Sequence, residues 1–329
     1  MTAMAANRPI FLVGCPRSGT TLLSVMLHAH PRIAMPPETR FLLPVYRERA
    51  TFGDLRDPGN KRRLAKRITA PRKSRFKDLG LDRRETIQAI VDAPPTIGSA
   101  AGTVWREFAH SRGKARWGEK RPAYWEAVDV VLRLFPDAQL IHLVRDGRAC
   151  FASLKQLEWW ERSSITTMTT WTLAQQELNR AGRHLPAQQY HRLRYEDLLA
   201  DPEPELDRLC RFLGEDFDPA MLEFGEAAAD IVPERKSWHE RTRGALDEAR
   251  VEAWRDVLDP EELGLFEHVA GRALRAEGYE PSGAGRRPSP AAIARYHARW
   301  AARRASLQRT RLLDAVQRRR ERTPLADQV

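Results

Sequence analysis

A glycine-rich turn lies between a short apolar run and an amphipathic segment near the start of the chain, and this arrangement restricts the fold more than any other feature. Ile10–Val13 has the length and composition of a buried strand, and residues 20–30 carry apolar side chains at helical spacing until Pro31. The turn between them, 14–19, has the GxxxxG spacing of a phosphate-binding loop. This order predicts an α/β fold with an anion site at a helix N-terminus.

The residues inside the turn differ from those of a magnesium-nucleotide loop. A nucleoside triphosphatase carries Lys followed by Ser or Thr, where the Lys binds the β- and γ-phosphates and the hydroxyl binds magnesium. This chain has Thr20 and Thr21 there, and its cation, Arg17, lies inside the turn. The pattern indicates an anion cradle with an arginine and no metal. A turn that merely joins a strand to a helix is the alternative that the spacing alone leaves open.

Two further apolar runs extend the pattern. Residues 139–144 and 190–194 are predicted strands; the first runs into a predicted helix that ends near Leu157, and the second leads into Tyr195-Glu-Asp-Leu198. We therefore expect a P-loop-like, three-layer α/β fold with a central, mainly parallel sheet flanked by helices. The stretch 45–115 shows little pattern apart from the basic segment 61–84, for which an amphipathic helix followed by a loop is expected. Other helices are expected at 159–183, 203–213, 251–258 and 261–276.

Charge divides the chain into two parts. The formal net charge is +11, and residues 286–329 hold 12 arginines against three acids. Residues 1–285 are therefore close to neutral, which gives no reason to expect nucleic-acid binding by the main body. We expect a main domain over 1–285 and a basic tail, helical or flexible, over 286–329. Ser289 followed by Pro290 has the form of a helix N-cap.

The composition also bears on location. No apolar run approaches the ~20 residues that a membrane-spanning helix needs. Three cysteines without a CxxC pair give neither a disulfide framework nor a zinc site. Residues 1–9 lack the apolar centre of a signal peptide. We therefore expect a cytoplasmic protein, soluble or peripheral to a membrane, with no bound metal.

The glycine turn has a specific resemblance. Gly14-Cys-Pro-Arg-Ser-Gly-Thr-Thr-Leu22 resembles the 5′-phosphosulfate loop of sulfotransferases that use 3′-phosphoadenosine 5′-phosphosulfate (PAPS), and its PRSGTT form is closest to the tyrosylprotein and carbohydrate branches. The resemblance covers roughly residues 8–280. It implies PAPS as co-substrate. The implied ligands of the 5′-phosphosulfate are Arg17, Ser18, Gly19, Thr20 and Thr21.

A second basic element follows the second predicted strand, at the end where open α/β sheets bind ligands. Arg145 offers fork-like donors to a phosphate, and Ser153 lies two helical turns later. The pair resembles the family's 3′-phosphate element, and Tyr195 resembles an element near the adenine. The alternatives are a structural ion pair of Arg145 with Asp146 or Glu196, and a core tyrosine.

Candidate catalytic groups come from two other segments. Pro36-Pro-Glu-Thr-Arg40 resembles the EETR segment of tyrosylprotein sulfotransferases, which implies Glu38 as general base and Arg40 as a substrate-binding residue. Lys120, in Gly118-Glu-Lys-Arg-Pro122, matches a family lysine near the transferring group, where it would act together with Arg17. Solvated surface side chains are the alternative for Glu38 and Lys120. Three histidines are alternative bases: His28, His30 and His142.

Some positions depart from the family pattern or do not align. Pro37 replaces an acidic residue, and Leu157 stands where tyrosylprotein sulfotransferases carry another arginine. Family members also close over the nucleotide with late basic residues. Here the candidates are Lys236, Arg241 and Arg243.

The leading hypothesis is a sulfotransferase that moves a sulfuryl group from PAPS to an acceptor hydroxyl or amine. The alternatives are a P-loop small-molecule kinase and a non-catalytic polyanion-binding protein. The acceptor class stays open between peptide, glycan, lipid and small molecule. Segment 61–84 is either a solvated helix face or part of a site for an acidic acceptor. For the tail, an anionic membrane, a polyanion, a homodimer contact and a solubilising extension all remain open.

Overall fold

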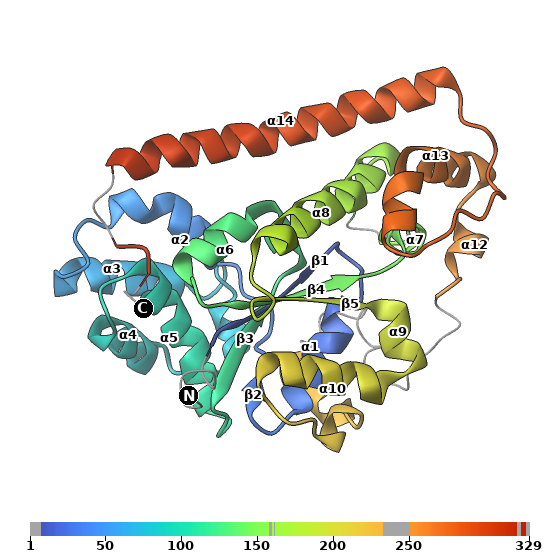
Figure 1. Ribbon diagram of the computed structural model, residues 1–329. Coiled ribbons are helices and arrows are strands. Elements are labelled where there is room, and N and C mark those ends of the chain that lie inside the picture. The colour runs from blue at the N-terminus through green and yellow to red at the C-terminus, as the bar shows by residue number, and fades with distance from the viewer. Residues whose placement is uncertain (1–7, 158–159, 161, 233–250, 321–323, 327–329) are drawn as a thin grey trace.

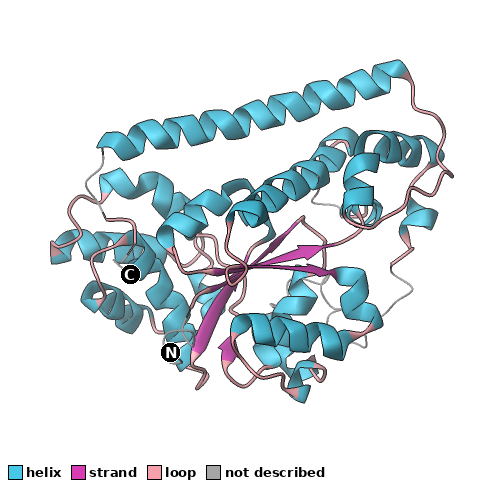
Figure 2. Ribbon diagram, in the orientation of Figure 1, coloured by secondary structure: helices cyan, strands magenta, loops and turns pink. Residues whose placement is uncertain are grey.

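The computed structural model describes residues 8–157, 160, 162–232, 251–320 and 324–326. A five-stranded sheet lies at its centre, with the order β2-β3-β1-β4-β5 and every pairing parallel. Helices cover both faces of the sheet (Figures 1 and 2). The predicted α/β fold with a central parallel sheet is confirmed. The strands are β1 (Ile10–Gly14), β2 (Ile33–Ala34), β3 (Arg116–Lys120), β4 (Gln139–Val144) and β5 (Tyr190–Arg194).

The helices fill the outer layers. Helix α8 lies over one face of the sheet, and α1 and α10 lie beneath the other (Figure 1). The helices of the first half are α1 (Thr20–Ala29), α2 (Leu42–Glu48), α3 (Pro58–Ile68), α4 (Arg83–Asp92), α5 (Ile97–His110), α6 (Val128–Leu134) and α7 (Gly147–Lys155). Those of the second half are α8 (Ser164–His184), α9 (Tyr195–Ala200), α10 (Pro202–Leu213), α11 (Gly225–Ile231), α12 (Trp254–Val257), α13 (Pro260–Ala276) and α14 (Pro290–Arg320). The described residues also contain four 3₁₀ turns: η2 (Arg49–Thr51), η3 (Phe76–Leu79), η4 (Pro122–Ala127) and η5 (Pro219–Met221).

Strand β3 was not predicted as a strand because its sequence, RWGEK, is mostly polar. All five of its residues are nevertheless buried. The Arg116 guanidinium donates to the carbonyl oxygen of Leu213 and to the side chain of Gln139, at 2.6 and 2.7 Å. Buried polar side chains are tolerated where hydrogen-bond partners satisfy them. A strand of this kind has no apolar run, which is the pattern by which buried strands are usually predicted.

The structure corrects several element predictions. The stretch 45–115 contains four helices, α2 to α5. In segment 61–84 the predicted amphipathic helix followed by a loop is confirmed in outline: α3 ends at Ile68, and the connection that follows contains η3 and ends where α4 begins at Arg83. The helix predicted from residue 159 begins at Ser164, because the Ser163 side chain accepts a hydrogen bond from the Thr166 N–H and caps it. Within 251–258 only α12 is helical.

Helix α14 lies along the outside of the molecule, over α8 (Figure 1). It starts as predicted, because the Ser289 hydroxyl accepts a hydrogen bond from the Ala292 N–H at 3.2 Å. The Tyr296 and Thr172 hydroxyls are 2.8 Å apart, and Arg311 binds the Glu177 carboxylate at 2.6 Å. Much of the predicted tail is thus a long helix packed on the main body. The division at residue 285 stays a prediction.

Two further findings concern the described part of the chain. No helix there combines the length and the apolar character that crossing a bilayer requires. Nor do the described residues bring together three or more His, Cys, Asp or Glu side chains as a metal site would need.

Candidate functional site

The loop between β1 and α1 has a backbone shape that depends on glycine. Gly19 has φ +93°, and a Cβ there would lie 2.3 Å from Cδ2 of the Tyr195 ring. Arg17 also has a positive φ, 72°, which is unusual for a residue with a side chain. Such backbone geometry concentrates at ligand-binding sites, where surrounding contacts hold it in place. The loop is therefore a tightly fixed turn at the carboxyl end of β1.

The loop also leaves donors open to an anion. Gly19 is the N-cap of α1 and offers no side-chain acceptor, and no acidic residue stands in the first turn. The N–H groups at the start of α1 thus keep the partial positive charge of a helix N-terminus. The Ser18 side chain is fully buried, and its Oγ has no hydrogen-bond partner among the described residues. A buried hydroxyl of this kind implies a ligand or a water, so the loop fits an anionic group.

The predicted 3′-phosphate residues lie beside the loop. The Arg17 Nε donates to the Ser153 Oγ at 3.0 Å, although 136 positions separate the two residues. The Arg145 guanidinium donates to the Arg17 carbonyl oxygen at 3.1 Å and lies 4.5 Å from the centre of the Tyr195 ring. Arg145, which follows β4, Ser153 of α7 and Tyr195 of α9 thus meet Arg17 and Gly19 of the loop. They can bind a second phosphate close to the first.

The two carboxylates considered as partners of Arg145 have other contacts. The Asp146 carboxylate binds the Arg148 guanidinium at 2.7 Å. The Glu196 carboxylate accepts hydrogen bonds from the Asp146 N–H at 3.0 Å and from the Tyr279 hydroxyl at 2.6 Å. Its charge helps burial to raise the pKa of Tyr279 well above the usual range. These contacts fix the start of α7, and they favour a role for Arg145 at the loop.

The candidate catalytic residues form a second group at the same end of the sheet. The Lys120 Nζ lies 3.7 Å from the Glu38 carboxylate and donates to the Thr21 hydroxyl at 3.3 Å. The Lys120 side chain is 6% exposed and that of Glu38 is 19% exposed, so both are shielded yet Glu38 remains accessible. A carboxylate, an ammonium and the loop are therefore contiguous. This arrangement can accept a proton beside a site that neutralises developing negative charge.

A buried carboxyl behind this pair was not singled out from the sequence. The Glu119 side chain is fully buried, and its Oε1 accepts hydrogen bonds from the Thr39 hydroxyl at 2.9 Å and from the Tyr124 hydroxyl at 3.4 Å. Burial raises the pKa of Glu119 to about 8, although the hydrogen bond from Thr39 acts to lower it. Glu119 is therefore mostly protonated at neutral pH. Its hydrogen bond fixes Thr39, the residue that follows Glu38. Its position in Gly118-Glu-Lys-Arg-Pro122 was the available signal.

The remaining candidates lie elsewhere. Arg40 has an exposed side chain, and its backbone N–H donates to the Ser74 carbonyl oxygen. His28 and His30 are at the far end of α1 from Thr21, about 10–14 Å away along a helix of this length. His142 is buried in β4, and burial lowers its pKa to about 3. The late basic candidates, Lys236, Arg241 and Arg243, lie outside the described residues.

The fold and the site together define a P-loop-like α/β protein in which a donor-rich loop and a neighbouring basic cluster lie beside a carboxylate–lysine pair. Residues 9–219 match the model of the sulfotransferase family. That match covers well over half of the chain, so the chain belongs to the sulfotransferase family.

Individual relatives agree with this assignment. The chain is 30% identical over 305 residues to the nodulation protein NoeE of Sinorhizobium fredii, across 83% of this chain and 66% of that protein. It is 26% identical over 223 residues to a protein-tyrosine sulfotransferase of Drosophila melanogaster, across 66% of this chain and 40% of that protein. The chain thus matches less than two thirds of the length of each of these relatives.

A solved structure extends the similarity to three dimensions. The sulfotransferase domain of the Synechococcus PCC 7002 olefin synthase superposes with a TM-score of 0.55 at 26% identity, over 82% of this chain and 94% of that one. The sulfotransferase domain of the curacin biosynthetic pathway has the same fold, with a TM-score of 0.54 at 21% identity.

Proposed function

We propose that this protein transfers a sulfuryl group from PAPS to an acceptor hydroxyl or amine. The observation that carries the proposal is the meeting of Arg17, Ser153 and Arg145 at the glycine loop. The loop supplies the buried Ser18 hydroxyl and the N-terminus of α1, which suit the 5′-phosphosulfate. Arg145 and Ser153 suit the 3′-phosphate. When bound, the donor would supply an activated sulfuryl group.

The chain's own residues would do three things during transfer. Glu38 would take the proton of the acceptor hydroxyl as its oxygen forms a bond to sulfur. Lys120, 3.7 Å away, would neutralise the negative charge that builds up as the sulfur–oxygen bond to the phosphate breaks. Arg17 would do the same from the loop. Thr21, which accepts from Lys120, would hold the lysine toward the loop.

Neutral Glu119 supports this arrangement from behind. A protonated carboxyl at Glu119 adds no negative charge beside Glu38, the residue that would take the acceptor's proton. We regard Glu119 as a positioning residue, because its contacts are with Thr39 and Tyr124 and not with the open side of the site.

Thermal unfolding with ligand tests the donor site. A ligand that binds only the native state raises the melting temperature. We expect stabilisation of the wild type by adenosine 3′,5′-bisphosphate and none by ADP with magnesium. Arg17→Ala should lose this stabilisation. Arg40→Ala, which removes the same charge from an exposed position, should retain it. Stabilisation by ADP with magnesium alone would favour a kinase and would contradict the proposal.

A further inference from the structure

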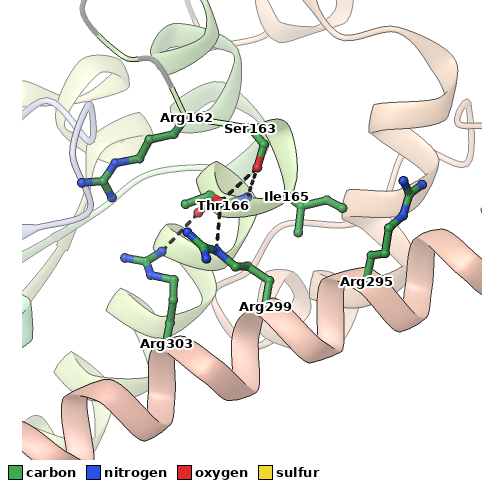
Figure 3. A pocket seen from close by; sticks show the side chains of 7 residues that line it. All are labelled: Arg162, Ser163, Ile165, Thr166, Arg295, Arg299 and Arg303. Carbon is green, nitrogen blue, oxygen red and sulfur yellow. Dashed lines mark hydrogen bonds between the residues drawn. The ribbon is translucent and has the colours of Figure 1, made fainter.

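A basic groove lies between α8 and α14, outside the donor site. Its volume is about 720 Å³, which is in the usual range for small-molecule sites. Its lining is polar except for Ile165, and four of the lining side chains are arginines (Figure 3). The complete lining is Arg162, Ser163, Ile165, Thr166, Arg295, Arg299 and Arg303.

Three of these arginines come from one face of α14. Arg295, Arg299 and Arg303 follow one another at intervals of four residues, so their side chains lie on the same side of the helix. Figure 3 shows them along α14, with those of Arg299 and Arg303 pointing to the N-terminal turn of α8. Like charges at this spacing destabilise a helix slightly, so the row is not explained by helix stability.

The arginines differ in what they bind. Arg303 is part of the scaffold: its Nη1 donates to the Thr166 carbonyl oxygen and to the Thr169 and Thr170 hydroxyls, at 2.8–3.1 Å. Arg299 makes one such bond, from Nε to the Thr166 hydroxyl at 3.1 Å. A guanidinium has five N–H donors, so most of those on Arg299 remain for a ligand.

Among the residues that the structure describes, few carboxylates lie beside the groove. Further along the same helix, Arg311 binds Glu177 and Arg318 binds Asp314. Within the described part of the chain, no carboxylate oxygen lies within 4.0 Å of a side-chain nitrogen of Arg162, Arg295 or Arg299. The carboxylate that Arg303 meets in the described ranges is that of Glu126, at 3.8 Å.

The cluster is therefore held together against repulsion. Burial lowers the pKa of Arg303, and the charges of Arg162 and Arg299 lower it further, although Glu126 acts in the opposite direction. The N-terminus of α8, a helix of 21 residues, adds its own partial positive charge. An anion bound in the groove would relieve this repulsion.

Arg303 connects the groove with the two segments that carry Lys120 and the glycine loop. The Arg303 guanidinium is 5.9 Å from the Trp125 ring, and Trp125 follows Lys120 by five residues, which limits the distance between their Cα atoms to about 18 Å. Arg303 is also close enough to the donor loop for its charge to act on the Cys15 thiol.

We propose that this groove binds an anionic group of the acceptor, a phosphate, a sulfate or a carboxylate, while the acceptor's hydroxyl or amine lies at Glu38 and Lys120. The assignment of the anion to an acceptor rests on the proposed sulfotransferase function. The existence of an anion site in the groove does not. Three of the four arginines lie outside residues 9–219, the part that matches the family model, so the groove is a feature that the family assignment does not supply.

Calorimetry with inorganic pyrophosphate tests the anion site, using the full chain saturated with adenosine 3′,5′-bisphosphate. We expect the wild type to bind pyrophosphate, and the double variant Arg295→Ala/Arg299→Ala to bind it roughly tenfold more weakly or worse. The control, Arg304→Ala/Arg309→Ala, removes the same charge from exposed positions of α14 and should bind like the wild type. Equal unfolding midpoints would show that both variants are folded.

Three outcomes would overturn the anion site: no pyrophosphate binding, an equal loss in both double variants, or competition between pyrophosphate and the bisphosphate. Failure of the bisphosphate to bind would instead contradict the proposed function. In that case, titration of pyrophosphate into the protein without the bisphosphate still tests whether the groove binds an anion.

A second arm tests whether the anion belongs to the acceptor. Hydroxyl acceptors are supplied as matched pairs, with and without a phosphate or carboxylate, and sulfuryl transfer is measured with PAPS. We expect kcat/KM for the anionic member to fall about tenfold in Arg295→Ala/Arg299→Ala, with no change for the neutral member. Equal losses for both members, or transfer to neutral members only or to none, would overturn the assignment to the acceptor.

Discussion

The glycine loop between β1 and α1 and the basic groove both bring arginines to the N-terminus of a helix, yet they are built in different ways. In the loop, Arg17 to Thr21 are consecutive residues, and one strand–turn–helix unit places them. In the groove, Thr166 of α8 meets Arg299 and Arg303, which follow it by more than 130 positions. The first site depends on local backbone geometry. The second depends on the packing of two long helices.

This difference explains why one site was found from the sequence and the other was not. A loop motif carries its own structural context, because a strand and a helix on either side of GxxxxG can form only a narrow set of turns. The Arg-rich segment 286–329 had no comparable context. Its arginines were compatible with a membrane, a polyanion or solvent until the contacts with α8 showed which of them face inward.

The largest effect should come from the proposed base. We expect Glu38→Gln to lower the rate of sulfuryl transfer by roughly 10²- to 10⁴-fold, because a general base contributes about that much. The rate is measured at saturating PAPS with any accepted hydroxyl compound. Binding of adenosine 3′,5′-bisphosphate should not change, and Glu85→Gln, on the exposed side of α4, should behave like the wild type. A variant that keeps its rate would remove Glu38 from the mechanism.

Gly19→Ala probes the local geometry of the loop. The φ of +93° and the approach of the Tyr195 ring to within 2.3 Å should together cost about 1–3 kcal/mol in the free energy of unfolding. Urea unfolding measures this loss. Gly225→Ala is the matched control, because a Cβ there meets no atom within 4 Å. Equal stability of the two variants would mean that the loop is not fixed as described.

Glu119→Gln should change how stability depends on pH. Glu119 has a pKa of about 8 in the folded protein and an ordinary value of 4.5, so between these values the folded state holds a proton that the unfolded state has lost. Wild-type stability should therefore fall as pH rises through this window, by about 1.4 kcal/mol per pH unit from this group. Glutamine cannot titrate, so the variant should lack this component. If the free energies of unfolding of the wild type and of Glu119→Gln change in parallel from pH 5 to 8, the raised pKa of Glu119 is contradicted.

The smallest effect should come from the packing of α14. We expect Arg303→Ala to lower the free energy of unfolding by about 1 kcal/mol, since its hydrogen bonds to Thr166, Thr169 and Thr170 are lost while repulsion from the neighbouring arginines is also relieved. Arg304→Ala removes a more exposed arginine of the same helix and should stay within about 0.5 kcal/mol of the wild type. A larger loss for Arg304 would contradict the described packing.

Much of the donor side could be predicted, and particular residues show the limit. Strands β4 and β5 were predicted with their observed bounds: β4 is mostly apolar, whereas β5 is a short, mostly polar segment that precedes a predicted family element. Strand β3 was missed because Arg116 and Glu119 are buried with polar partners, which local hydropathy cannot reveal. The same burial gives Glu119 its raised pKa. Its role therefore depends on long-range packing, and sequence spacing does not show it.

Helix α14 is anchored by charged side chains to a large extent, and this has a consequence for its dynamics. Asp314 binds Arg49 and Arg133, and Arg311 binds Glu177. Partly buried ion pairs of this kind are screened by salt less than exposed ones, but they still weaken with ionic strength, whereas the apolar packing of β1 and β4 does not. We therefore expect the backbone amides of α14 to exchange with deuterium faster as ionic strength rises, while those of the central sheet stay protected. Ionic strength would then set how often the groove comes apart while the donor loop persists.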